Sequence, residues 1–374
     1  MRRVWMKSLA SRLILVMLAV CAAPLAAQPG RPSRPVAITD PAEAGRDYAL
    51  QGEYAGWVQA DCGWQYVGLQ VVTLGEGQFE AVLYAGGLPG NGGSRQPLEK
   101  LTGRAADGPL VLQGPTSQVA IQAGDAQVYD RDQQPKGRLE KVVRYSPTLG
   151  LAPPPGAIIL FDGRSTEAFQ PGAKMTDDGL LLAGAMTRMP VGAFRLHLEF
   201  RTPLMPTARG QARGNSGVYI QRRYEVQILD SFGLEGAFNE CGALYRQTPP
   251  LINACLPPLA WQTYDIWFTP PVFAADGKTK LASARITVLH NGVPIHVHRE
   301  ITAKTGGGQP EGPQPLPLLL QDHGNPVVFR NVWLVPGEGD EWAPYASGPS
   351  ARRGLLRRIA GTTVTLGRSK RATH

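Results

Sequence analysis

Short runs in which apolar and polar residues alternate, separated by turns that contain glycine, fill most of the chain and limit what it can form. Such runs occur at 66–72, 79–84, 194–200 and 284–289. Successive side chains point to opposite faces only in an extended strand, so these runs predict β-strands. No long segment after the first thirty residues has helical periodicity, and the 44 glycines and 33 prolines suit turns between strands. The sequence therefore predicts an all-β protein.

The length of 374 residues exceeds that of one ordinary domain. Residues 44–146 are predicted to form a small antiparallel β domain, whose aromatic side chains are expected in its core rather than as a platform for sugars. A proline-rich linker, 147–155, separates it from a larger β domain at 156–336. In the second domain, Asn291-Gly292 between two apolar runs predicts a hairpin.

The amino-terminal segment 1–27 has the pattern of a secretory signal peptide. Basic residues precede the apolar run 13–23, and Leu25-Ala26-Ala27 offers small residues for cleavage. A Pro/Arg-rich linker, 28–43, follows. The protein is thus expected to be exported, to the periplasm or beyond the cell. An uncleaved anchor is the alternative, and a lipoprotein at Cys21 is disfavoured because Val20 is bulkier than the small residue expected there.

The net charge of +8 resides at the two ends of the chain. The leader holds four basic residues and the tail 346–374 holds seven, neither has an acidic one, and the rest carries −3. A nucleic-acid-binding domain needs its basic face on the fold, so nucleic acid is not an expected partner. The tail is predicted to be a solvated, disordered end, with contact to anionic surface polymers or lipid as the alternative. Oligomeric state is left open.

Four cysteines are present, and Cys21 belongs to the leader. Cys241 and Cys255 bracket a proline-rich loop, and an oxidising compartment would favour a disulfide between them. Cys62 is left over and is expected as a buried thiol. The sequence has no CxxC pair and no HExxH motif, which argues against a structural zinc site.

Six stretches of the second domain together resemble the 3-keto-disaccharide hydrolase domain family. The resemblance covers about residues 156–336. It implies a concanavalin-like jelly roll that acts on glycosides whose sugar is oxidised at carbon 3. The stretches, in order, are Leu160-Phe161-Asp162-Gly163, Gly214-Asn215-Ser216-Gly217-Val218-Tyr219, Tyr224-Glu225-Val226-Gln227-Ile228-Leu229-Asp230, Trp261-Gln262-Thr263-Tyr264-Asp265, His290-Asn291-Gly292, and Leu320-Gln321-Asp322-His323-Gly324-Asn325 with Phe329-Arg330-Asn331.

Glu225 is the strongest catalytic candidate because it lies in an otherwise apolar strand, where a carboxylate either faces solvent or serves a site. Glu225 and Gln227 share a face of that strand, and Asp230 joins them only if a β-bulge adds one residue. The E-x-Q-x-x-D spacing resembles the E-x-D-x-x-E signature of laminarinase-type glucanases. However, Gln227 cannot titrate, and Asp230 is too short and distant for a retaining carboxylate pair.

A ketone at carbon 3 makes a simpler mechanism available. It acidifies the proton on carbon 2, so that one base can form an enolate and the glycosidic oxygen leaves from carbon 1. Glu225, Asp230 and His323 are the candidates for proton transfer. Asn215, Tyr219, Gln227, Gln321 and Arg330 are expected to bind substrate, with Asn215 or Arg330 stabilising the oxyanion. No cofactor is predicted, although a divalent cation is a further option.

Each of these residues also has a structural interpretation. Asp230 precedes Ser231 and could cap a turn, His323 lies before a Gly-Asn-Pro turn, and Arg330 could serve an ion pair. At the level of function, the alternatives to an enzyme are a non-catalytic carbohydrate-binding sandwich and an adhesive surface protein. The polar residues of the matching motifs favour the enzyme, because a binding module would use more exposed aromatic side chains.

Overall fold

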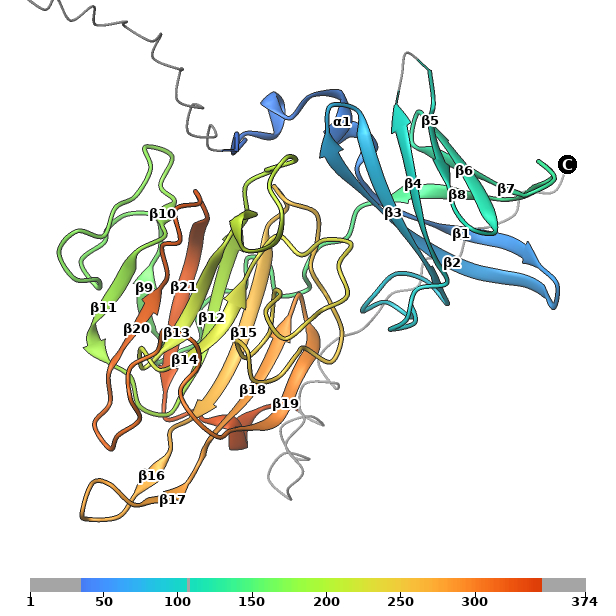
Figure 1. Ribbon diagram of the computed structural model, residues 1–374. Helices are drawn as coiled ribbons and strands as arrows, with labels where there is room; N and C mark the ends of the chain where they lie inside the picture. Colours follow the sequence, from blue (N-terminus) through green and yellow to red (C-terminus); the bar gives the residue numbers. More distant parts are fainter. Residues whose placement is uncertain (1–34, 106–107, 345–374) are drawn as a thin grey trace, which may run out of the picture. The chain divides into compact units, whose positions relative to one another are not determined.

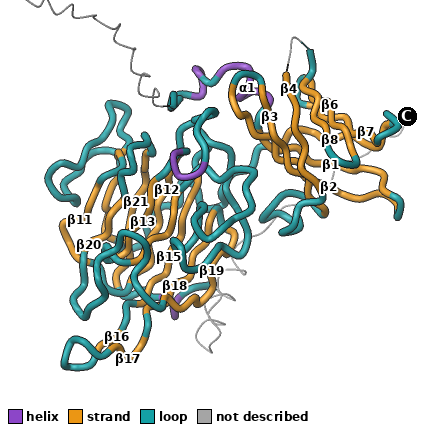
Figure 2. Tube along the Cα trace, in the orientation of Figure 1, coloured by secondary structure: helices purple, strands orange, loops and turns teal. Residues whose placement is uncertain are grey.

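The computed structural model describes residues 35–105 and 108–344 of the chain. Strands dominate it, and its only α-helix among these residues is the short α1 (Gly45–Leu50) (Figure 2). Three 3₁₀ turns, η1 (Pro41–Glu43), η2 (Gly210–Ala212) and η3 (Asp340–Trp342), complete the helical content. The all-β prediction is confirmed.

Eight antiparallel strands follow one another around a closed barrel, in which β1 also pairs with β8 (Figure 1). Inward-pointing side chains such as Tyr54, Leu69 and Phe79 fill the barrel and are fully buried. The strands are β1 (Gly52–Ala60), β2 (Gly63–Gly75), β3 (Gln78–Ala85), β4 (Glu99–Ala105), β5 (Leu110–Gln113), β6 (Ser117–Gln122), β7 (Asp125–Asp130) and β8 (Pro135–Val142).

The expectation that the aromatic residues of this part are core residues is only partly correct. Trp57, Trp64 and Tyr66 lie exposed on β1 and β2. Cys62, expected as a buried thiol, is exposed in the turn between the same two strands. A residue on the outer side of a barrel strand remains in contact with solvent unless another element covers it.

The remaining strands form a sandwich of two antiparallel sheets (Figure 1). The larger sheet holds β9 (Ile158–Phe161), β10 (Leu181–Leu182), β12 (Phe194–Arg201), β15 (Gln262–Thr269), β18 (Ala284–His290), β19 (Val293–Ile301) and β21 (Val328–Pro336). The smaller sheet holds β11 (Ala185–Pro190), β13 (Ser216–Ile220), β14 (Tyr224–Ile228) and β20 (Pro317–Leu320), and the pair β16 (Val272–Phe273) and β17 (Lys280–Ala282) lies apart.

One apolar core lies between these two sheets. Phe194, Leu196 and Leu198 reach it from β12, while Val218 and Val226 reach it from β13 and β14. The intervening residues of each strand therefore point away from the core, as the period-two alternation requires. This alternation decides which polar side chains can meet on the far face of each sheet.

The predicted hairpin at Asn291-Gly292 is present between β18 and β19. Both residues have positive φ, +52° for Asn291 and +76° for Gly292. Two successive residues with positive φ are typical of the type I′ turn, whose twist matches that of the flanking strands.

The alternation of apolar and polar residues in β12 would leave one face of the strand exposed to solvent, but both of its faces are buried. The segment 146–151 covers the outer face with hydrogen bonds. Thr148 Oγ1 donates to Asp265 Oδ2 (2.7 Å), and the Gly150 N–H donates to Glu199 Oε1 (2.6 Å). Part of the predicted linker is thus docked on the sheet, and the polar side chains of β12 are desolvated beneath it.

Burial pushes the pKa of Glu199 upward, but hydrogen bonds outweigh this effect and lower it to about 2. The donors are Asn331, Arg330 and the Gly150 N–H, and His197 Nε2 lies 3.8 Å from the carboxylate. The carboxylate is therefore ionised and fixes the outer face of the larger sheet by several contacts at once.

The predicted signal peptide and the basic tail lie outside the described residues. Within residues 35–105 and 108–344, no helix has the length and apolar character needed to span a bilayer. In the predicted 28–43 linker, the Ile38 N–H donates to the Leu204 carbonyl (2.9 Å), so Ile38 is held by a backbone hydrogen bond.

Gly292→Ala tests the docking of the linker. Gly292 has a positive φ, which is unfavourable for alanine, and a Cβ at this position would clash with the Pro147 ring. We therefore expect the variant to lose roughly 2 kcal/mol or more of its free energy of unfolding. Gly277→Ala is the matched control, because its φ is +66° but its nearest neighbouring atom is 3.6 Å away. Urea denaturation of both variants measures the difference, and equal losses would argue against the docked linker.

Candidate functional site

Glu225 and Gln227 lie on the same face of β14, as the sequence predicts. β13 and β14 pair without a register shift, with Tyr219 opposite Glu225 and Gly217 opposite Gln227. Since Val218 and Val226 point into the core, these four residues point away from it. The pairing of two adjacent strands thus brings a carboxyl, a phenol and an amide together.

The carboxyl group of Glu225 is enclosed by this cluster. Glu225 is 2% exposed, and its Oε2 atom has no hydrogen-bond partner. With the Gln227 amide turned so that its nitrogen faces the carboxyl, that nitrogen donates to Glu225 Oε1 (3.0 Å) and to the Ser216 carbonyl (2.8 Å). We adopt this orientation because the opposite one would place the amide oxygen against acceptors only.

Because Gly217 has no side chain, there is room beside it for the Glu225 carboxyl group. A Cβ built at Gly217 would lie 2.6 Å from Glu225 Oε1 and 3.3 Å from Gln321 Oε1. Any larger residue would therefore displace the acid. Gln321 Oε1 is itself buried without a hydrogen-bond partner, as is Glu225 Oε2. Unsatisfied buried polar atoms are uncommon, and they frequently mark a place where a ligand binds.

Burial raises the pKa of Glu225 to about 7, although the hydrogen bond from Tyr219 works against the rise. Burial likewise raises the pKa of Tyr219 far above its usual value, helped by the nearby Glu225. Tyr219 is therefore a neutral donor, while Glu225 exchanges its proton near neutral pH. A carboxyl group with a pKa near 7 suits general acid–base catalysis.

The segment 305–308 covers the pair. The Gly307 N–H donates to the Tyr219 hydroxyl oxygen, which leaves the phenol proton directed to Glu225. Thr305 Oγ1 accepts the backbone N–H of Glu225 (2.7 Å). A Cβ at Gly306 would lie 2.8 Å from the Tyr245 ring and 3.5 Å from Glu225 Oε2. Glycine is needed here because the backbone passes so close to the acid.

Three half-buried side chains, Gln211, Tyr245 and Gln321, lie at the rim of the cluster. Gln211 Oε1 is 3.0 Å from the Gln227 amide and 3.4 Å from the Tyr245 hydroxyl. Asn215 Nδ2 donates to the Gln211 carbonyl (2.7 Å), which brings this predicted residue to the same side. The sequence patterns did not predict three residues of this cluster, namely Gln211, Tyr245 and Thr305. The Gly306-Gly307-Gly308 run was the one local signal for that region.

Asp230 is not brought to Glu225, because β14 continues without the expected bulge and ends at Ile228. Its carboxylate instead pairs with Arg213 (Nε to Oδ2, 2.7 Å), and both side chains are buried. Burial raises the pKa of Asp230, and Arg213 opposes this change. Oδ1 accepts the Phe232 N–H (3.3 Å), which matches the turn-capping alternative.

Arg330 belongs to the other sheet. Its Nε donates to Glu199 Oε2 (2.7 Å), and its guanidinium carbon lies 4.0 Å from the centre of the Trp261 ring. β21 and β12 carry these groups on the face turned away from the core, so the core separates Arg330 from Glu225. The expectation that Arg330 contributes to the same site is wrong, and its ion-pair alternative holds.

His323 lies in an exposed loop after β20, two residues beyond Gln321. Within the described part of the chain, its imidazole makes no hydrogen bond or ion pair. A role in proton transfer therefore stays a prediction.

The expected disulfide is not formed. Cys241 and Cys255 are both buried free thiols, although they lie within hydrogen-bonding reach of each other. Cys241 Sγ is also 3.2 Å from the Tyr264 hydroxyl. Cys241 and Cys255 are thus neighbours, as predicted, but the predicted disulfide between them is wrong.

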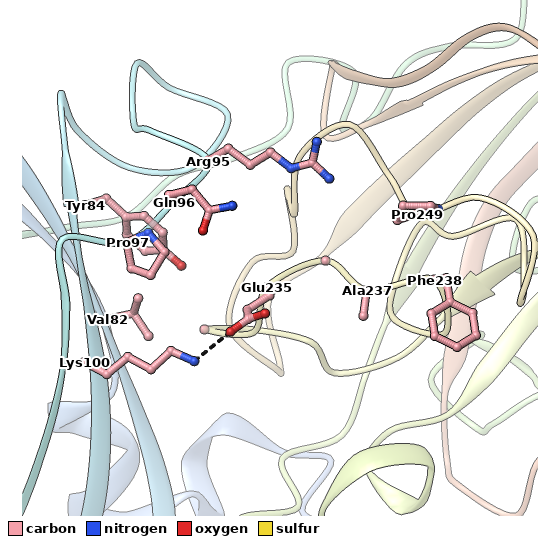
Figure 3. A pocket seen from close by; sticks show the side chains of 12 residues that line it. Val82, Tyr84, Arg95, Gln96, Pro97, Lys100, Glu235, Ala237, Phe238 and Pro249 are labelled. Carbon is pink, nitrogen blue, oxygen red and sulfur yellow. Dashed lines mark hydrogen bonds and ion pairs between the residues drawn. The ribbon is translucent and has the colours of Figure 1, made fainter.

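No group of three or more His, Cys, Asp or Glu side chains that could hold a metal ion occurs within residues 35–105 and 108–344. A pocket of about 400 Å³ lies elsewhere, between the β3–β4 region and the loop that contains Glu235 and Phe238 (Figure 3). The ion pair of Lys100 with Glu235 (2.9 Å) borders it. Glu225 does not line this pocket, so the pocket is separate from the cluster described above.

Comparison with known proteins yields one family. Residues 156–335 match the model of the 3-keto-alpha-glucoside-1,2-lyase-like domain. No curated protein matches the chain.

Three solved structures from Parabacteroides distasonis ATCC 8503, provisionally described as glycosyl hydrolases, are also similar. Their sequence identities to this chain are 33%, 18% and 22%. The alignments cover 49%, 48% and 48% of this chain and 84%, 94% and 98% of those chains, with TM-scores of 0.46, 0.37 and 0.32.

Arg213→Ala tests whether Asp230 is structural. The variant leaves a buried carboxylate without its partner, and we expect it to lose about 3–5 kcal/mol of stability in urea denaturation. The double variant Arg213→Met with Asp230→Leu removes both charges and should recover most of that loss. If the double variant is as unstable as the single one, the ion pair is not what Asp230 contributes.

Tyr219→Phe tests the hydrogen bond to Glu225. Removing the phenol takes away a donor to the carboxylate, so the pKa of Glu225 should rise above its value in the parent protein. Carboxyl ¹³C NMR over a pH series measures this change. Tyr145→Phe is the control, because Tyr145 is exposed and its removal should leave the titration unchanged. An unchanged Glu225 titration in Tyr219→Phe would contradict the described contact.

Proposed function

Residues 156–335 belong to the family of 3-keto-alpha-glucoside-1,2-lyase-like domains, and on this basis we propose that this protein cleaves glycosides whose sugar carries a ketone at carbon 3. The family supports a hydrolase-like, carbohydrate-active protein. The observation that carries the finer proposal is the buried Glu225, with a pKa of about 7 and a free carboxyl oxygen.

Glu225 acts as the base in this proposal. It takes the proton from carbon 2, the electrons of that C–H bond form the enolate, and the ketone oxygen carries the negative charge. Collapse of the enolate forms the carbon 1–carbon 2 double bond and expels the glycosidic oxygen as an alkoxide. The alkoxide takes up a proton to become the free alcohol, and water then adds to the double bond.

The other members of the cluster would bind and orient the sugar. Tyr219 and the Gln227 amide hold the Glu225 carboxyl in place, so one of its oxygens is fixed and the other remains for the substrate. Asn215, Gln211 and Gln321 offer amides to sugar hydroxyls and to the enolate oxygen. His323, exposed two residues beyond Gln321, is the candidate that delivers the proton to the leaving alkoxide.

A single titrating carboxyl fits elimination better than a two-carboxylate glycosidase. Asp230, the second acid in the sequence motif, is held by Arg213 and lies in a buried ion pair. A retaining glycosidase needs two carboxyl groups about 5–5.5 Å apart, both of them able to reach the sugar. Elimination from a 3-keto sugar has no such requirement, because the ketone supplies the acidity of carbon 2.

Export of this activity to the periplasm or beyond the cell is part of the proposal. It is supported by the basic and apolar residues of the leader 1–27. It also fits the placement of the excess positive charge at the ends of the chain.

Glu225→Gln should abolish turnover of 3-keto-trehalose and 3-keto-glucosides, since the amide has the same shape but cannot accept a proton. In the parent protein, kcat/KM should fall about tenfold per pH unit below a pKa near 7 and level off above it. Release of free sugar over a pH series measures both effects.

Glu167→Gln provides the matched control, because this substitution changes a surface acid outside the cluster and should leave turnover intact. Parent-like turnover by Glu225→Gln would remove Glu225 from the mechanism. A rate that is independent of pH between 5 and 9 would show that another group is the base.

A further inference from the structure

The hairpin of β1 and β2 carries three large aromatic side chains on its surface. Trp57 is 56% exposed, Trp64 is 62% exposed and Tyr66 is 38% exposed. Large aromatic residues usually bury most of their surface, and clustered exposed ones mark interaction sites. The proposed reaction at Glu225 makes no use of them.

The strand register places these side chains together on one face. Trp57 is directly opposite Tyr66, and Gln59 is directly opposite Trp64. Residues two apart on a strand share a face, so all four form one group, which we call the aromatic patch. The rings of Trp57 and Tyr66 contact edge to face, with centroids 5.3 Å apart. Gln59 is exposed among them and offers both a hydrogen-bond donor and an acceptor.

The charges beside the aromatic patch favour a neutral partner. Arg138 on β8 is the residue in register with Trp57, and its guanidinium pairs with Asp125 (2.6 Å). The turn between β1 and β2 carries a charged residue, the exposed Asp61. A surface built for anionic lipid or a polyanion would instead present several unpaired cations.

We propose that the aromatic patch binds a neutral polysaccharide chain. The faces of indole and phenol rings pack against the C–H faces of pyranose rings, and the Gln59 amide can hydrogen-bond to sugar hydroxyls. An open strand surface suits a chain that runs across it, whereas a small ligand needs an enclosing pocket. The choice of carbohydrate as ligand rests on the function proposed for residues 156–335 of the same chain.

Retention of the full chain on microcrystalline cellulose, chitin and insoluble starch tests this proposal. The assay contains about 0.5 M NaCl, which shortens the reach of charge interactions and suppresses ionic binding by the basic tail. We expect retention on at least one of the three polysaccharides. Trp57→Ala with Trp64→Ala should weaken it by roughly tenfold or more, the scale of lost aromatic stacking.

Trp342→Ala is the matched control, because it removes a tryptophan that is 66% exposed outside the aromatic patch. It should leave retention unchanged. Trp57→Phe with Trp64→Phe keeps aromatic faces at both positions and should retain most of the binding, which separates stacking from a folding defect. Glu225→Gln should bind as the parent does, so a failure of the proposed reaction would leave this result standing.

Four outcomes would overturn the proposal. They are no retention on any of the three polysaccharides, equal retention by the double alanine variant, and an equal loss in Trp342→Ala. The fourth is that the aromatic patch instead mediates binding to phosphatidylcholine–phosphatidylserine vesicles or self-association in sedimentation, without binding polysaccharide.

Discussion

The desolvation of one carboxyl group, that of Glu225, determines the chemistry available to the smaller sheet. The strand that carries it inserts Val226 and Ile228 into the core, so Glu225 is held rigidly on the opposite face. Gly217 leaves room for the acid, and segment 305–308 closes over it. Water would stabilise the charged form of an exposed glutamate. In Glu225 that water is excluded, so the neutral and charged forms are close in free energy near pH 7.

The two sheets of the sandwich differ in how many hydrogen-bond donors surround a buried carboxyl group. On the larger sheet, Glu199 has an excess of donors, and its pKa is lowered to about 2. On the smaller sheet, Glu225 has few donors and a pKa of about 7. A fully satisfied carboxylate is a structural element that stays ionised, whereas an incompletely satisfied one can exchange a proton. This difference, rather than burial alone, distinguishes the candidate catalytic carboxyl group of Glu225 from the carboxylate of Glu199, which holds segment 146–151 on the larger sheet.

The barrel and the sandwich present different kinds of surface. The sandwich gathers amides and the Tyr219 phenol around Glu225, which suits the cleavage proposed above for a single sugar. The barrel exposes aromatic rings along two adjacent strands, which suits contact with a longer chain. Together, the two proposals give the barrel the contact with a polymer and the sandwich the reaction on smaller oxidised glycosides.

The sequence by itself determined the all-β class, the hairpin at Asn291-Gly292 and the shared face of Glu225 and Gln227. Each follows from short-range rules, namely alternation with period two and the positive φ that a tight turn requires. Only the tertiary structure decided that Arg330 lies across the core from Glu225 and that Asp230 pairs with Arg213. It also decided that Trp57 is exposed while the polar side chains of β12 are buried. Alternation predicts that a strand has two faces, but which face is covered depends on elements distant in the chain, such as segments 146–151 and 305–308.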